Sequence, residues 1–146
     1  MVEPASRVSL SLLPPPAVPP IQALPSVLLV EEHDEMRSAL RDWLLTSFPP
    51  LRLREARSME EALLLAGQAA LDLALINLEL PGPNGIEAAR LMRKRHPGCR
   101  VVVMSVNDSM ALRIAALAAG AEAFVCKRDL RIALLPIVAA LGKPPS

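Results

Sequence analysis

Five polar side chains stand at or just beyond the ends of apolar runs in this sequence: Glu31, Glu32, Asn77, Ser105 and Lys127. Paired acids hold a hard cation such as Mg²⁺ through oxygen, and a lysine and a hydroxyl bind the oxygens of a phosphoryl group. Arranged around a central carboxylate, such a set would accept a phosphoryl group. The central residue here is Asn77, whose amide cannot form the mixed anhydride of an acyl phosphate. The residue types describe a phosphoryl-transfer site that lacks its nucleophile.

Each of these residues also has a plain structural explanation. Glu31 and Glu32 could form a solvated strand exit. Ser105 could be a turn residue, and Lys127 a surface charge ahead of a helix. Taken alone, each residue type more often has that role. Their occurrence together, each at the end of an apolar run, is what indicates a site.

No other acid near the central position convincingly replaces the missing carboxylate. Asp72 lies at the start of the same apolar run, about 17 Å away at roughly 3.3 Å per residue. Glu79 is closer but lies beyond the end of that run. With one carboxylate removed from three, we expect Mg²⁺ to bind weakly or not at all. Without a cation or a phosphoryl group, Lys127 can pair permanently with Glu31 or Glu32.

The elements that must position these residues follow from the hydrophobic pattern. From Ser26 onward, short apolar runs alternate with helical faces, which predicts βα units around a parallel sheet. The expected strands are Val27–Val30, Leu51–Ala56, Leu71–Asn77, Arg100–Ser105 and Ala121–Cys126. Open parallel sheets bind ligands beyond the carboxyl ends of their strands, near the point where strand order reverses. The five polar residues are therefore expected to converge on one crevice.

Each expected strand is followed by a helix with its own signals. The first has an apolar face from Met36 to Leu44 that includes Trp43 as a core anchor, and the second opens with a Ser58–Glu61 capping box. The remaining helices are expected at about 84–95, 109–119 and 129–141. Asp129 is the candidate cap of the last helix, which Pro136 should kink.

Composition limits the class of protein. The 146 residues are 52% hydrophobic and 21% charged with a net charge of +1, which fits one domain without a surface for nucleic acid or membrane. The apolar runs are shorter than the roughly 18 residues of a membrane-spanning helix. The two cysteines have no paired spacing, which favours a reducing cytoplasm. No Ser-His-Asp or Cys-His arrangement is evident, and we expect no enzyme activity.

The two ends of the chain differ from its middle. Residues 1–25 hold seven of the fifteen prolines, so we expect a disordered proline-rich tail. It is either an inert extension, the product of a misplaced start codon or a ligand for a proline-binding domain. The folded domain is expected at residues 26–141. Residues 142–146 form a short C-terminal tail that cannot supply an output domain.

Four segments in order resemble the receiver domain of bacterial two-component response regulators. They are Val27–His33, Asp72–Ala88, Val101–Ser105 and Gly120–Lys127. The last segment and the final helix are most similar to receivers that precede a helix-turn-helix domain. The resemblance implies a flavodoxin-like, doubly wound α/β fold with a five-stranded parallel sheet in the order 2-1-3-4-5.

The resemblance also implies a role for each site residue. Glu31 and Glu32 match the metal-binding acidic pair, although the family more often has aspartate there. Asn77 matches the phosphoacceptor aspartate. The remaining matches are Ser105 as the phosphoryl-sensing hydroxyl, Phe124 as the aromatic switch and Lys127 as the phosphoryl-pairing lysine. A permanent ion pair of Lys127 would, in this scheme, fix one conformation.

These inferences predict a stand-alone pseudo-receiver that signals through protein contacts independent of its own phosphorylation. The expected partner is a histidine kinase or another regulator. A homodimer or partner surface is expected from the fourth strand to the fifth helix, where helix 109–119 is more apolar than one buried face needs. The alternatives are an ordinary receiver whose aspartate was replaced by Asn77, and a decayed gene product without function.

Overall fold

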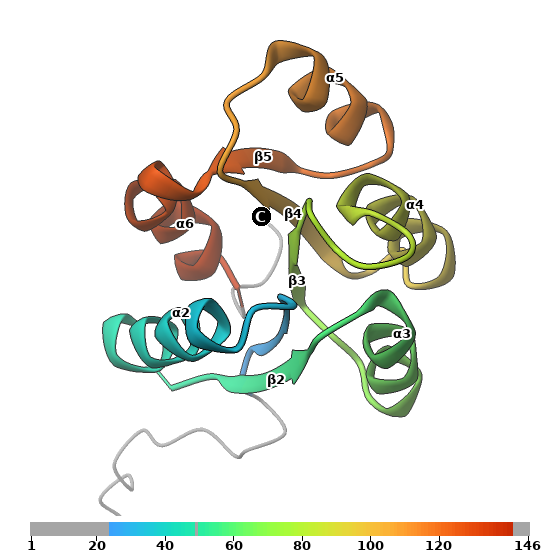
Figure 1. Cartoon of the computed structure of the whole chain (residues 1–146). Coiled ribbons are helices and arrows are strands. Elements are labelled where there is room, and N and C mark those ends of the chain that lie inside the picture. The colour runs from blue at the N-terminus through green and yellow to red at the C-terminus, as the bar shows by residue number, and fades with distance from the viewer. Residues whose placement is uncertain (1–23, 49, 142–146) are drawn as a thin grey trace, which may run out of the picture.

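The structure is a computed structural model that describes residues 24–48 and 50–141, so the predicted tails at 1–25 and 142–146 lie almost wholly outside the described residues. Within the described residues, five parallel strands form one sheet in the order β2-β1-β3-β4-β5 (Figure 1). They are β1 (Ser26–Val30), β2 (Arg52–Ala56), β3 (Leu73–Asn77), β4 (Arg100–Ser105) and β5 (Ala123–Cys126). Strand order reverses between β1 and β3, which confirms the predicted fold class. Sheets of this kind bind ligands at that point.

In the described part of the chain, helices cover both faces of this sheet (Figure 1). They are α2 (Asp34–Ser47), α3 (Met59–Gln68), α4 (Gly85–Arg95), α5 (Met110–Ala118), α6 (Leu130–Ala139) and the short 3-10 helix η2 (Lys127–Asp129). α2 and α6 pack on one face, and α3, α4 and α5 pack on the other. Among residues 24–48 and 50–141, no helix combines the length and apolar character needed to cross a bilayer.

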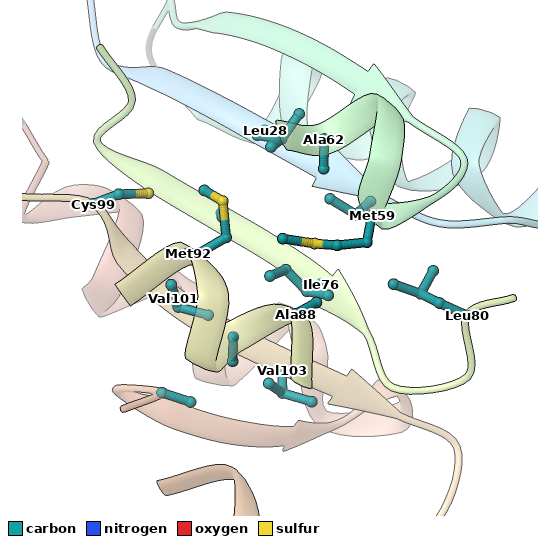
Figure 2. Close-up of a cluster of buried hydrophobic side chains, with 14 of the residues drawn as sticks. Leu28, Met59, Ala62, Ile76, Leu80, Ala88, Met92, Cys99, Val101 and Val103 are labelled. Atoms are coloured by element: carbon teal, nitrogen blue, oxygen red, sulfur yellow. The ribbon is translucent and has the colours of Figure 1, made fainter. Parts of the chain in front are cut away.

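The core under α3, α4 and α5 is built from alternate residues of the central strands. Figure 2 shows Leu28 of β1, Ile76 of β3 and Val103 of β4 in one cluster with Met59 of α3 and Met92 of α4. All five side chains are at most 1% exposed. Because the central strands are buried on both faces, their sequences are continuously apolar, and polar side chains gather at the strand ends.

The fifth strand begins later than the sequence predicts. β5 starts at Ala123 rather than Ala121, because the Ala121 amide donates to the Ala116 carbonyl at the end of α5, at 3.1 Å. Gly120 makes this helix ending possible with φ of +104°, a conformation that residues with a Cβ rarely adopt. Ala121 and Glu122 therefore belong to the helix-to-strand turn.

The predicted details of the last helix were partly wrong. α6 runs from Leu130 to Ala139, and Pro136 lies inside it as predicted. The Asp129 side chain makes no capping hydrogen bond, because the chain enters α6 directly from the η2 turn. The helix ends two residues before the predicted end at Leu141.

The buried face of α2 is narrower than predicted. Leu40 and Leu44 are buried against the sheet, and Trp43 is half-buried against the same cluster. Met36 is 38% exposed and Ala39 is also exposed. These two side chains line a cavity instead of the core.

Cys99 should be chemically inert in the folded protein. Burial, reinforced by the negative charge of Asp72 and opposed by Arg93, raises the pKa of its thiol from 9.0 to about 11. Because the thiolate is the nucleophile, we expect alkylation of Cys99 at pH 8 to be about a hundredfold slower than in the urea-unfolded chain. Peptide-resolved mass spectrometry after timed exposure to iodoacetamide measures both rates. Rates within about tenfold of each other would contradict the expected burial effect.

Candidate functional site

Polar residues are buried at the carboxyl edge of the sheet. In the described part of the chain, the buried polar side chains are Ser26, Glu31, Asn77 and Ser105, each at most 3% exposed. Three of them stand at the carboxyl ends of β1, β3 and β4. Lys127 directly follows β5, and its side chain is 13% exposed. The register of the parallel strands thus gathers residues that are far apart in the sequence.

The Glu31 carboxylate is at the centre of this group. Its Oε1 accepts a hydrogen bond from Lys127 Nζ at 2.7 Å, and its Oε2 accepts one from Asn77 Nδ2 at 3.1 Å. The backbone N–H of His33 also donates to Oε2, at 3.3 Å. Glu31 is fully buried, so its charge requires both an ionic partner and hydrogen-bond donors. Lys127 and the two N–H groups supply them.

The Asn77 side chain donates in two directions. Besides Glu31, Nδ2 donates to the backbone carbonyl of Glu79 at 2.8 Å. Turning the amide over would place its oxygen against two acceptors, so the donor set fixes the orientation. Its Oδ1 is buried without a hydrogen-bond partner among the described residues. An acceptor left unpaired in this way costs about 1–3 kcal/mol, which the two N–H donations offset.

Glu79 belongs to the site. From the sequence alone, it is considered only as a replacement for the missing carboxylate and is set aside. Its Oε1 accepts a hydrogen bond from Ser105 Oγ at 3.0 Å, and Ser105 Oγ accepts one from the Asn107 amide at 3.0 Å. Glu79 lies two residues past the end of β3, at the same edge of the sheet as Asn77. That position is the signal by which it could have been found.

Two predicted site residues lie away from the cluster. Glu32 is exposed, and its backbone carbonyl, not its carboxylate, accepts from Arg37 at 3.4 Å. Phe124 is 2% exposed and belongs to the core. The Arg113 guanidinium lies over the Phe124 ring, 5.3 Å from its centroid, and donates to the Phe124 carbonyl at 2.8 Å.

A cavity of about 550 Å³ opens at this edge. It is lined by His33, Glu35, Met36, Ala39, Asn77, Glu79, Val106 and Lys127. Met36 and Ala39 come from the start of α2, and Val106 follows β4. The cavity therefore lies where strand order reverses, with apolar walls around the polar cluster.

The residues at this edge do not fit Mg²⁺ in their present arrangement. A hard cation requires several converging oxygens. Here Asn77 presents nitrogen to both Glu31 and the Glu79 carbonyl, and the Lys127 ammonium already pairs with Glu31. No group of three or more His, Cys, Asp or Glu side chains within the described residues is placed to hold a metal ion. The Glu31 carboxylate oxygens and the Glu79 carbonyl oxygen, which could face a cation, instead accept hydrogen bonds from Lys127 and Asn77.

Known proteins are similar to this chain in sequence and in fold. The sequence profile described as "Response regulator receiver domain" matches residues 27–138. The chain is 37% identical over 101 residues to the transcriptional activator protein ExaE of Pseudomonas putida, covering 69% of this chain and 47% of that protein. It is 35% identical over 102 residues to the DNA-binding transcriptional activator DevR/DosR of Mycobacterium tuberculosis, covering 69% of this chain and 46% of that protein.

Among solved structures, a two-component response regulator of the LuxR family from Aurantimonas sp. SI85-9A1 superposes with a TM-score of 0.71 at 30% identity. The match covers 80% of this chain and 86% of that one. The matched region spans less than half the length of each of these two curated relatives. Because the family profile covers most of the chain and the fold agrees, the protein belongs to the response regulator receiver domain family.

Proposed function

We propose that this receiver domain takes part in two-component signal transduction through protein contacts that do not depend on its own phosphorylation. One observation carries the proposal: Asn77, 1% exposed, stands at the end of β3 where its amide donates to Glu31. An amide is not a nucleophile for phosphoryl transfer, so an acyl phosphate cannot form at this residue. The Lys127–Glu31 ion pair, at 2.7 Å, supports a fixed conformation of the strand ends.

The proposed partners are a histidine kinase or another regulator, in the cytoplasm, and we assign no enzyme activity to the domain. Exposed apolar side chains support an interface on α5, which also suits a homodimer: Met110 is 68% exposed, Ile114 60% and Leu117 46%. Contact with nucleic acid is not part of the proposal for this domain. The relative from Mycobacterium tuberculosis is DNA-binding, and the expectation that nucleic acid plays no part finds no support in the comparisons.

A second candidate is an ordinary phosphoaccepting receiver in which aspartate was replaced by Asn77. The observation that favours it is the surrounding set: Glu31, Ser105 and Lys127 all remain at the edge where a phosphoryl group would be bound. Under this alternative, restoring the carboxylate restores the reaction.

An intact-mass experiment tests the proposal. The protein is incubated with acetyl phosphate and Mg²⁺ and then weighed by mass spectrometry, and we expect no phosphoryl adduct on the wild-type chain. An adduct on the wild type would contradict phosphorylation-independent signalling. The Asn77→Asp variant separates the two candidates, because uptake of one phosphoryl group by the variant would favour a preserved site, whereas no uptake would favour a site that has diverged.

A further inference from the structure

A chain of hydrogen bonds connects the strand ends through four side-chain groups and the backbone carbonyl of Glu79. Lys127, after β5, binds Glu31, after β1. Asn77, at the end of β3, binds Glu31 and the Glu79 carbonyl. The Glu79 carboxylate then binds Ser105, at the end of β4. Four strand ends and the β3–α4 loop are therefore held together by internal groups.

The charges in the cavity disfavour an added anion. Glu31, Glu35 and Glu79 lie in or beside it, and Lys127 is the one lysine or arginine among the described residues that line it. That cation is already 2.7 Å from the Glu31 carboxylate. An anion that approached Ser105 would meet the Glu79 carboxylate, which already accepts the Ser105 hydroxyl proton. The hydroxyl has its acceptor within the chain.

A cation meets a comparable obstacle. The Asn77 Nδ2 group lies between Glu31 Oε2 and the Glu79 carbonyl oxygen, at 3.1 and 2.8 Å. Both oxygens are of the kind that a hard cation binds, and both already accept hydrogen bonds from Asn77. To bind, the cation would have to displace the amide protons and turn the Asn77 oxygen inward.

We propose that Glu79 is a positioning residue, and that its carboxylate and the Asn77 amide take the places of an external anion and a divalent cation. Glu79 holds the end of β4 through Ser105, and Asn77 holds the β3–α4 loop through the Glu79 carbonyl. The site then keeps one conformation with neither ion bound. This inference rests on the proposed function, since it supplies the means by which the domain acts without phosphorylation.

Hydrogen exchange of the Asn107 amide tests the role of Glu79, because that amide donates to Ser105 Oγ. We expect Glu79→Ala to accelerate its exchange about tenfold or more, and Glu79→Gln, which keeps an acceptor for Ser105, to accelerate it less. Glu35→Gln is the matched control, because it removes the same charge from an exposed position on the same cavity. It should leave the Asn107 exchange rate unchanged.

The amide of Val103, in the core of β4, reports global unfolding in the same experiment. Equal acceleration at Val103 and Asn107 would mean that Glu79 supports the whole fold, and would overturn the proposal. Unchanged Asn107 exchange in Glu79→Ala would overturn it as well. So would an effect of Glu35→Gln as large as that of Glu79→Ala.

Thermal unfolding with EDTA or Mg²⁺ tests the role of the Asn77 amide. We expect the wild-type Tm to be independent of Mg²⁺. Asn77→Asp should lower the Tm by about 5–10 °C in EDTA, because a charge-assisted hydrogen bond becomes a repulsion, and Mg²⁺ should restore most of the loss. A wild-type Tm that rises with Mg²⁺ as much as that of the variant would overturn the proposal. No phosphodonor is present in either test, so failure here leaves the proposed function standing.

Discussion

Replacing Lys127 with methionine should lower the free energy of unfolding by about 3–5 kcal/mol at neutral pH. Lys127 Nζ lies 2.7 Å from Glu31 Oε1, and the Glu31 side chain is fully buried. Removing the ammonium leaves the buried carboxylate with two neutral N–H donors and the exposed His33 imidazole, whose Nδ1 lies 3.6 Å from Glu31 Oε2. These contribute less than a lysine at 2.7 Å. Methionine keeps an unbranched side chain of similar length, so the decrease in the free energy of unfolding measures the effect of removing the charge. Urea denaturation followed by circular dichroism measures it.

Two further variants separate the ion pair from general effects at this position. Arg128→Met removes a neighbouring charge that is 68% exposed and pairs with Asp108 at 3.2 Å, and should cost at most about 1 kcal/mol. In the double variant Glu31→Gln, Lys127→Met, the buried charge is absent, and at least about half of the stability lost in Lys127→Met should return. A loss in Lys127→Met no greater than that in Arg128→Met would show that the pair is not the stabilising contact.

Much of the site could be predicted from the sequence because parallel-sheet topology places strand ends together. The apolar runs stop at Asn77 and Ser105, which are the last residues of β3 and β4 in the structure. Once the runs are recognised as parallel strands, their carboxyl ends must share an edge, whatever the side chains are. That argument also places Lys127 at the edge, directly after β5.

Side-chain direction beyond the strand ends could not be predicted in the same way. Glu31 and Glu32 are neighbours of the same type, and successive residues in extended backbone point to opposite sides. One of them is buried and the other exposed, and the choice depends on the packing of α2 and β2 around them. The sequence places Glu79 near the same edge, but the direction of its side chain could not be predicted, because the course of the β3–α4 loop is set by tertiary contacts and not by periodicity.

One of those contacts is the close approach of Gly85 to the end of β3. A Cβ at this position would lie 2.5 Å from the Asn77 carbonyl oxygen and 2.6 Å from Leu78 Cα. Both atoms belong to the backbone, so no side-chain rotation can relieve the overlap. The Gly85 amide donates to the Leu78 carbonyl at 2.8 Å, which fixes the start of α4 against the strand that carries Asn77.

Gly85→Ala should therefore destabilise the domain by about 3 kcal/mol or more, because the start of α4 or the end of β3 must move. Gly67→Ala is the matched control, since Gly67 lies inside α3 with nothing within 4 Å of its added Cβ. It should stabilise the domain by about 0.5–1 kcal/mol through its helix preference. Urea denaturation of both variants measures the difference, and a Gly85→Ala variant as stable as Gly67→Ala would contradict the close approach. Because Asn77 lies at the point of overlap, the same substitution should also accelerate exchange of the Asn107 amide, which links the helix position to the site.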